Sequence, residues 1–330
     1  MNTFFCRAFQ CCFAVGARFL PWRTPEVFSG EGSLLRAADI LRENGLRRPF
    51  VIASRRQCAD EHFRALQEKL DEQDILLSIF SSVEPNPSVE TVEKIAAQYK
   101  IDSCDCFLVI GGGSPMDAAK ALSQLVGLLK VRHRIPPLIA VPTTAGTGSE
   151  TTIAAVVTGS DHHKYAISDL CLIPRYAILD PALTVGLPPH ITAETGMDAL
   201  THAVEAYLSR FYNTKQTRLL AEHAVVAIFT HLERAYRDGT SLPDRAAMLQ
   251  ASFDAGAAFT RASVGNVHAI AHTLGGLYGV PHGLANAVLL PLVLEDYGKA
   301  AYPCLARLAA LVGLKGATEE VRAKAFIAEI

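Results

Sequence analysis

The stretch "CFLVIGGGSPMDAAK", residues 106–120, contains an apolar run, three glycines and the start of an amphipathic helix. The run 106–110 is short and apolar, which predicts a buried strand. Ser114 can cap the helix, Pro115 suits its first position, and Asp117 falls at the third, where a carboxylate reaches free amides. Three glycines allow close approach to the backbone, so the turn indicates either an anion site or merely a tight turn.

Similar units continue on both sides of this stretch, from about residue 30 to residue 182. Short apolar runs alternate with helical patterns, which indicates βαβ units and a parallel sheet that is covered on both faces. The predicted strands are 49–54, 74–80, 106–110 and 137–141, and the predicted helices between them include 63–70, 89–99 and 116–129.

From residue 191 onward the periodicity is almost exclusively helical. The predicted fold class is therefore α/β, with an N-terminal Rossmann-like parallel-sheet domain over residues 1–182 and an all-helical domain over residues 183–330. The helices are predicted at 191–208, 215–236, 243–260, 264–277, 281–297 and 303–312.

Composition excludes several classes of partner. Half of the 330 residues are hydrophobic, 19% are charged and the net charge is −2, without a basic tract, which argues against nucleic acid. No apolar run reaches the length of a membrane span. The eight cysteines show neither zinc-finger nor C-x-x-C spacing, which predicts free thiols and a cytoplasmic protein.

Residues 1–25 form a separate question, because they are apolar, carry scattered arginines and contain no acid. Such a segment resembles a targeting peptide. Polar residues interrupt it, however, and no small-residue cleavage site follows. We therefore expect an amphipathic N-terminal helix that docks on the fold.

A second polar turn, within "PLIAVPTTAGTGSE" at residues 137–150, also follows a predicted strand. The carboxyl ends of parallel strands form the crevice in which open α/β sheets bind ligands. Two such turns together predict a nucleotide site. Its candidate residues are Gly111, Gly112, Gly113, Ser114 and Asp117 in the first turn and Thr143, Thr144, Thr147 and Ser149 in the second.

The helical half contains an unusual set of acidic and imidazole side chains. Asp198 and His202 are four residues apart on one predicted helix, and so are His268 and His272 on another, while His282 begins the next helix. Residues at this spacing share a helix face. Structural hydrogen-bonded pairs are one explanation, but a carboxylate with several imidazoles and no cysteine better suits Fe²⁺ or Zn²⁺.

Taken together, these motifs resemble those of the iron-containing (group III) alcohol dehydrogenases, an architecture that is similar to dehydroquinate synthase. The resemblance covers residues 83–292 and extends more loosely back to about residue 28. The motifs that carry it are "VIGGGSPMDAAKA", "IAVPTTAGTGSET", "TGMDALTHAVEAYLS" and "VHAIAHTLGGLYGVPHGLANAVLLP".

The resemblance implies a site and a reaction. Asp198, His202, His268 and His282 would be the metal ligands, and His272 would lie beside the substrate, where it is the candidate for relaying a proton. The ion would act as a Lewis acid on an alcohol oxygen while hydride passes between a primary alcohol and NAD(P). Lys164 aligns with a lysine near the nicotinamide ribose, although a solvated surface lysine is an alternative.

Two features depart from the family pattern. Members that prefer NAD usually carry an aspartate at the end of the first strand, where this chain has Ser54, Arg55 and Arg56. Guanidinium groups suit a 2′-phosphate, which predicts NADP(H) rather than NAD(H). The chain is also shorter than family members, so the helical domain is expected to be truncated at its C-terminus and to expose apolar faces.

Several alternatives remain at this level. The chain could be a non-catalytic nucleotide- or metal-binding remnant, or a glycerol-dehydrogenase-like polyol oxidoreductase. The residue pattern hints at an apolar pocket and a short aliphatic alcohol or aldehyde as substrate, and dimers are common among similar proteins. The residues expected to line that pocket are Phe253, Phe259, Val264 and Tyr278.

Overall fold

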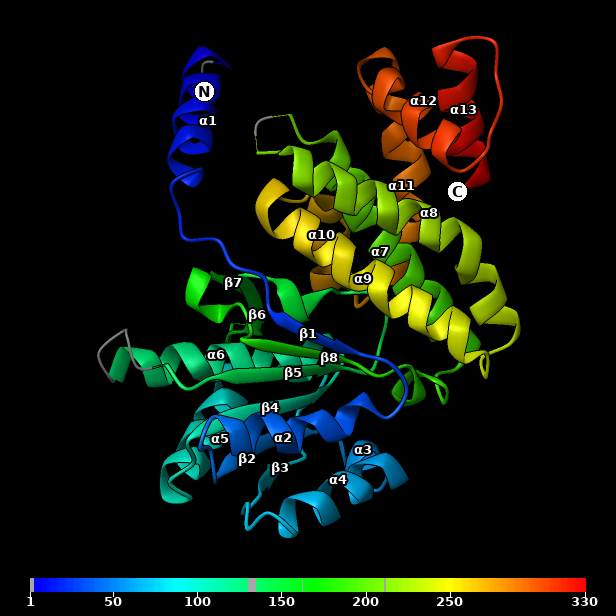
Figure 1. Cartoon of the computed structure of the whole chain (residues 1–330). Helices are drawn as coiled ribbons and strands as arrows, with labels where there is room; N and C mark the ends of the chain where they lie inside the picture. The colour runs from blue at the N-terminus through cyan, green and yellow to red at the C-terminus, as the bar shows by residue number, and fades with distance from the viewer. Residues whose placement is uncertain (1–2, 130–134, 162, 211) are drawn as a thin grey trace.

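A six-stranded, entirely parallel sheet organises the N-terminal half of the computed structural model, which describes residues 3–129, 135–161, 163–210 and 212–330 (Figure 1). The strand order β1-β8-β5-β4-β2-β3 places the first and last strands side by side at one end of the sheet. The strands are β1 (Glu26–Ser29), β2 (Pro49–Ala53), β3 (Ser78–Phe80), β4 (Cys106–Gly111), β5 (Leu138–Pro142) and β8 (Tyr176–Leu179).

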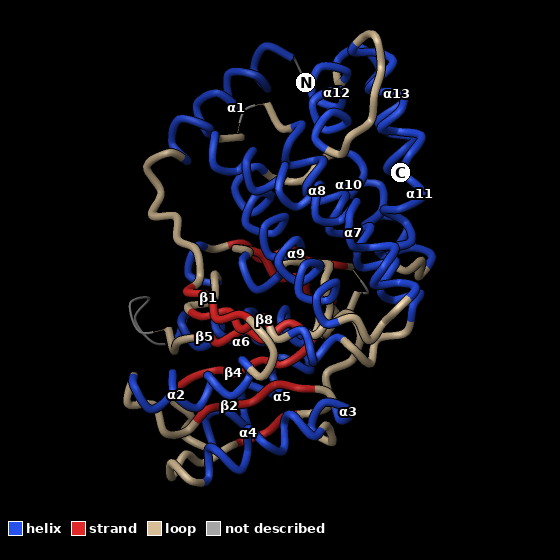
Figure 2. The backbone as a smooth tube through the Cα atoms, turned by 45° about the vertical axis from the view of Figure 1, so that its right-hand side comes forward, coloured by secondary structure: helices blue, strands red, loops and turns tan. Residues whose placement is uncertain are grey.

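Helices cover both faces of this sheet, as its continuous apolar strands require (Figure 2). On one face Val51, Leu108 and Ile139 are buried with side chains from α2 (Arg36–Glu43) and α4 (Glu61–Asp71). On the other face Phe50 and Phe107 are buried with side chains from α5 (Val89–Ile101) and α6 (Gly113–Leu129). The predicted parallel α/β fold is confirmed.

Some strands were predicted incorrectly or missed. The strand expected at 74–80 is only three residues long, β3, because Asp74 takes a positive φ of 55° in a turn. β1 and β8 escaped the sequence pattern because each has only four residues. An antiparallel pair, β6 (Ala154–Thr158) and β7 (Lys164–Ser168), was also missed.

The N-terminal helix is present as α1 (Thr3–Ala17), which stands apart from the sheet in Figure 1. Its docking is slight. Phe13 meets Tyr212 edge-on with ring centroids 5.6 Å apart, whereas Phe5 and Phe9 are largely exposed. Beyond the helix, the Arg261 guanidinium lies over the Trp22 ring.

The C-terminal half is helical, as predicted, and Figure 1 shows it stacked beside the β1–β8 end of the sheet. Many of its core residues are alanine, which lets the helices approach closely. The helices are α7 (Pro189–Leu208), α8 (Lys215–Arg237), α9 (Leu242–Ala262), α10 (Asn266–Tyr278), α11 (His282–Tyr297), α12 (Tyr302–Leu311) and α13 (Glu319–Glu329).

The exposed large apolar side chains of this half lie mainly on α10 and α11. Leu277 is 72% exposed there, and Val288 and Leu292 are each 57% exposed. Within the described parts of the chain, no helix combines the length and apolar character needed to cross a membrane.

Candidate functional site

The turn after β5 joins the two halves of the molecule. Gly146 packs directly on Thr195 of α7, because a Cβ added to Gly146 would lie 2.7 Å from the Thr195 Cβ. Gly148, whose φ is +57°, packs on Gly256 of α9, and a Cβ on Gly148 would lie 2.6 Å from the Gly256 Cα. Both contacts require glycine, so this turn fixes the sheet against the helical half.

The two glycine-bearing turns also lie against each other. The Thr143 backbone N–H donates to the Gly111 carbonyl over 3.1 Å. A Cβ added to Gly112 would lie 3.0 Å from Thr144 Oγ1, and a Cβ on Gly113 would lie 3.2 Å from Thr147 Cγ2. The structure therefore brings the predicted nucleotide-binding turns together at the carboxyl ends of β4 and β5, where α/β sheets bind ligands.

Two roles that were predicted within the first turn are wrong. Helix α6 begins at Gly113, so Ser114 lies inside it, and the Ser114 hydroxyl accepts a hydrogen bond from the Asn86 backbone instead of capping. Asp117 does not reach the free amides of the helix start. Its carboxylate faces Lys120 and a backbone N–H of Val156, and burial raises its pKa to about 7.

Residues 54–56, which follow β2, were expected to bind a 2′-phosphate, but two of the three side chains form hydrogen bonds within the protein. Ser54 forms a capping box with Gln57 at the start of α3 (Arg55–Cys58), so its hydroxyl already accepts a hydrogen bond. Arg56 donates to the Gly186 carbonyl of the connection to the helical half, 2.8 Å away. Arg55 is exposed, and its side chain forms no hydrogen bond or ion pair with the described residues. Gln57 donates to Thr143 Oγ1, which links this segment to the second turn.

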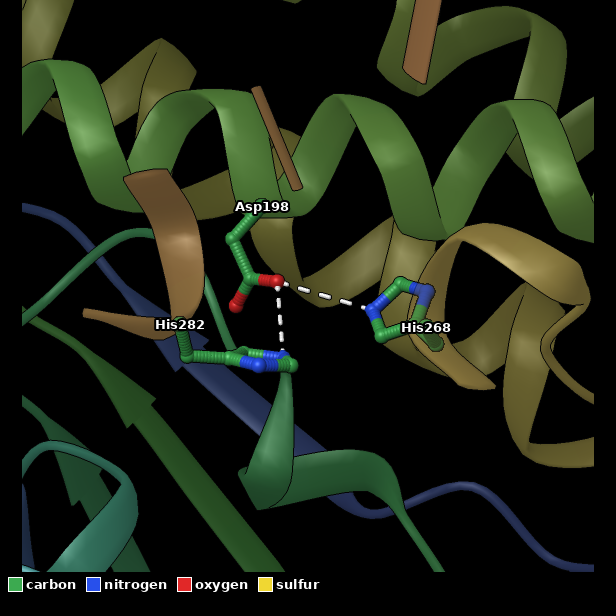
Figure 3. A group of neighbouring side chains, drawn as sticks. All are labelled: Asp198, His268 and His282. Atoms are coloured by element: carbon green, nitrogen blue, oxygen red, sulfur yellow. Dashed lines mark ion pairs between the residues drawn. The ribbon is translucent and has the colours of Figure 1, made fainter. Parts of the chain in front are cut away.

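The candidate metal ligands converge on one carboxylate oxygen. Asp198 Oδ1 on α7 lies 3.6 Å from His268 Nε2 on α10 and 3.4 Å from His282 Nε2 on α11. Figure 3 shows both imidazoles pointing at this carboxylate from separate elements. One donor atom from each of the three residues lies within 4.8 Å of the others, a set that one metal ion can bridge.

His202 lies beside this group, on the same helix as Asp198. Its Nδ1 is 4.0 Å from Asp198 Oδ1. Its ring stacks on the rings of Phe259 and His268, with centroid distances of 4.1 Å and 4.3 Å. This Nδ1 is buried without a hydrogen-bond partner among the described residues. A buried nitrogen lone pair without a partner is costly, and a metal ion would satisfy it.

The pKa values of the four candidate ligands shift in different directions. Burial opposes ionisation of Asp198, but His202 and His268 outweigh it and hold the pKa of its carboxyl well below the usual range. Burial lowers the pKa of His202 to about 3 and also lowers that of His282. Burial acts in the same sense on His268, yet hydrogen bonds with Asp198 and Glu205 raise its pKa to about 9. A metal ion at this site would therefore displace a proton from His268.

Sequence reasoning missed two residues of the site. The Asn286 amide is fully buried, and its Nδ2 lies 2.7 Å from Asp198 Oδ1 and 3.2 Å from the Nε2 atoms of His268 and His282. Glu205 accepts a hydrogen bond from His268 Nδ1 over 2.6 Å. The signal was available, because Asn286 follows His282 by four residues and Glu205 follows His202 by three.

His272 and Lys164 border the same group on its open side. The His272 ring centroid is 5.0 Å from that of His282. Desolvation and the nearby positive charges of His282, His268 and Lys164 lower the pKa of His272 to about 4. Lys164 on β7 reaches towards α10, where its Nζ would lie 3.9 Å from a Cβ on Gly275. Both residues are thus placed near the candidate metal ligands.

The residues that were expected to form one apolar substrate pocket lie in different places. Phe253 packs with Ala177 and Leu179 of the sheet, and Tyr278 is 75% exposed. Val264 lines a 460 Å³ cavity beside α1, which Phe259 does not line. Helical periodicity identified apolar positions but not the neighbour that each one faces. Phe259 stacks on the candidate ligand His202.

Comparison with known families accounts for nearly the whole chain. Residues 24–181 match the family described as iron-containing alcohol dehydrogenase. Residues 192–330 match the C-terminal domain of the Fe-containing alcohol dehydrogenase family. The interval between the matches coincides with the change from sheet to helices.

Individual proteins agree with this result. The chain is 39% identical to alcohol dehydrogenase 4 of Schizosaccharomyces pombe over 272 residues, which are 79% of this chain and 64% of that protein. It is 43% identical to 1,3-propanediol dehydrogenase of Klebsiella pneumoniae over 235 residues, 68% of this chain and 60% of that protein. The matches thus span less than two thirds of each relative's length.

A solved structure extends the similarity to the fold. Sulfoacetaldehyde reductase from Bifidobacterium kashiwanohense, in complex with NAD⁺, superposes with a TM-score of 0.83 at 29% identity, covering 94% of this chain and 85% of that one. The comparisons favour neither a remnant nor a glycerol-dehydrogenase-like enzyme. With matches to both halves in order, the chain belongs to the iron-containing alcohol dehydrogenase family.

Proposed function

We propose that this protein is a metal- and NAD(P)-dependent alcohol dehydrogenase that also works as an aldehyde reductase. The observation that carries the proposal is the convergence of His268 and His282 on Asp198, beside the turn that joins the sheet to the helices. The relatives' names, which refer to alcohols and propanediol, support the reaction class.

In this proposal Asp198, His202, His268 and His282 hold the metal, and the residues present suit it. One carboxylate and three imidazoles without a thiolate match the preferences of Fe²⁺ and Zn²⁺, and the family favours iron. When bound, the ion supplies a Lewis acid for the alcohol oxygen and the nicotinamide supplies the hydride acceptor.

The surrounding residues orient the reactants and move the proton. Gly112, Gly113 and the turn 143–149 bring backbone close to the nucleotide, as phosphate binding requires. His272 is the proposed proton relay, because its ring centroid lies 5.0 Å from that of the candidate ligand His282 and its lowered pKa keeps the imidazole neutral near pH 7. Lys164 contributes positive charge on the same side and is proposed to lie near the nicotinamide ribose.

Preference for NADP(H) follows from the residues after β2. Positions 54–56 contain no acid that could bond a ribose 2′-hydroxyl, and the Arg55 side chain is exposed and has no partner among the described residues. Arg55→Ala is expected to raise the KM for NADPH about tenfold and to change that for NADH little. Equal kcat/KM for the two nucleotides in the unmodified protein would overturn this preference.

The reaction and the site are tested together by elemental analysis and turnover. Protein purified without oxygen is expected to carry about one iron or zinc per chain and to oxidise NAD(P)H in the presence of aldehydes. Asp198→Asn should lose both properties, whereas Asp254→Asn, also a carboxylate paired with a histidine, should keep both. Nucleotide binding without turnover in the metal-loaded protein would support the remnant alternative instead.

The cellular location and the oligomeric state are also part of the proposal. The eight cysteines have neither C-x-x-C nor zinc-finger spacing, a usage that supports a reducing, cytoplasmic environment. A homodimer is proposed from the family resemblance, and light scattering after size exclusion would test it.

A further inference from the structure

Behind the candidate metal ligands lies a buried carboxylate that no proposed step uses. Glu205 is on α7, one further turn along from His202, and its side chain is only 2% exposed. It lies on the side of His268 away from Asp198, since His268 uses Nδ1 for Glu205 and presents Nε2 to Asp198. An isolated buried carboxylate is costly, so its partners decide what it does.

Three donors surround this carboxylate. Oε2 accepts hydrogen bonds from His268 Nδ1 over 2.6 Å and from the Gly265 backbone over 2.8 Å. Oε1 accepts one from the Val267 backbone over 2.7 Å. The two amides belong to the start of α10, where backbone N–H groups lack partners within the helix. Glu205 therefore caps the helix that carries His268 and also holds the His268 ring.

The local backbone is built for this contact. A Cβ added to Gly265 would lie 2.7 Å from Glu205 Oε1, so only glycine allows the amide to approach the carboxylate so closely. Two residues earlier, Ser263 takes a positive φ of 67°, which is uncommon for a residue with a side chain. This strained turn ends α9 and directs the start of α10 towards Glu205.

We propose that Glu205 is a positioning residue for the metal site. It accepts a hydrogen bond from Nδ1 of His268, which turns Nε2 towards Asp198 and makes it the atom available to the ion, and it holds α10 at the distance that ligation needs. This inference rests on the proposed metal site and extends it to a residue that does not itself touch the ion. Carboxylates behind a ligating histidine orient the ring and increase its basicity.

Glu205→Gln tests the proposal with nearly unchanged shape. The glutamine has a single oxygen for three donors, and its NH₂ group would face one of them. We expect Co²⁺ to bind about 10- to 100-fold more weakly, as measured by anaerobic titration of the visible absorption bands. Glu222→Gln is the matched control, since Glu222 is a partly buried carboxylate on α8 that accepts from Tyr207. It should bind Co²⁺ like the unmodified protein.

Two further measurements separate positioning from folding. Gly265→Ala keeps the charge of Glu205 but displaces its carboxylate, so it should weaken Co²⁺ binding in the same range while far-UV circular dichroism stays unchanged. ¹⁵N spectra of the imidazoles in the Zn²⁺-loaded protein, in which Nε2 has lost its proton to the ion, should show Nδ1-protonated His268 and a change of that protonation in Glu205→Gln, with His268→Ala identifying the signal.

The outcomes distinguish this inference from the proposed function. Co²⁺ binding by the unmodified protein, its loss in His268→Ala and an affinity within twofold of normal in Glu205→Gln would overturn the inference alone. Absence of Co²⁺ binding by the unmodified protein would overturn the metal site and the inference together.

Discussion

Replacing Gly256 with alanine examines how the two halves of the molecule are joined. A Cβ at this position of α9 would lie 2.4 Å from Thr151 Oγ1, 2.7 Å from the Gly148 carbonyl oxygen and 2.8 Å from the Gly148 Cα. The Thr151 side chain can rotate away, but the Gly148 atoms are backbone. Because carbon atoms prefer separations of about 3.5–4.0 Å, the turn and α9 must move apart by about 1 Å.

The size of the effect follows from two opposing contributions. Overpacking of a tightly packed region costs about 1–3 kcal/mol. Alanine is more favourable than glycine within a helix by about 1 kcal/mol, which offsets part of that cost. The difference, a net loss of up to about 2 kcal/mol, corresponds to a decrease in Tm of up to about 8 °C for a domain of this size.

Differential scanning calorimetry would measure this change, and Gly276→Ala provides the control. Gly276 is also within a helix, α10, but a Cβ there would meet no atom within 4 Å. That variant should gain about 0.5–1 kcal/mol from helix propensity alone. Opposite signs for the two variants are expected, together with weaker nucleotide binding for Gly256→Ala. A Tm for Gly256→Ala at or above that of the unmodified protein would refute the reasoning.

Three other expectations concern buried residues. Burial raises the pKa of Glu150 from 4.5 to about 7. Between these two pH values the folded protein therefore binds more protons than the unfolded chain, and its free energy of unfolding falls by about 3 kcal/mol as the pH rises from 4.5 to 7. Glu150→Gln should flatten this loss in urea titrations between pH 4.5 and 8; an unchanged slope would contradict it. Lys120 is fully buried and donates hydrogen bonds to the Thr152 and Ala154 carbonyls. Lys120→Met should therefore lower the free energy of unfolding by about 3 kcal/mol or more. A loss below about 1 kcal/mol in urea unfolding would show that these hydrogen bonds do not stabilise the fold. A Cβ on Gly283 would lie 2.2 Å from the Glu194 carbonyl oxygen, so Gly283→Ala should push α11 away from α7. Titration should then show Co²⁺ binding that is at least tenfold weaker. An unchanged affinity would show that His282 tolerates the shift of its helix.

Much of the fold could be predicted because its signals are local. The helices of the C-terminal half follow from apolar periodicity, and their observed ends lie within a few residues of those expected. β2, β4 and β5 follow from buried apolar runs. β1 and β8 could not be predicted in this way, because four residues carry no period and their pairing joins positions 26–29 to 176–179.

In the candidate site, too, local relations could be predicted and long-range contacts could not. By itself the sequence determined that Asp198 and His202 share a helix face and that His268 and His272 share another, because 3.6 residues per turn imposes this on any helix. It also determined that two glycine-bearing turns follow strands. These relations depend only on neighbours along the chain.

Only the tertiary structure decided which of these groups meet. Packing of α10 and α11 against α7 brings His268 and His282 to one oxygen of Asp198, and it buries Asn286 and Glu205 beside them. Packing also brought the Ser114 hydroxyl to the Asn86 backbone and the Asp117 carboxylate to the Val156 backbone, whereas the capping box of Ser54 with Gln57 is local. Contacts between residues 60 or more positions apart depend on how whole helices dock, and no local pattern in the sequence specifies that geometry.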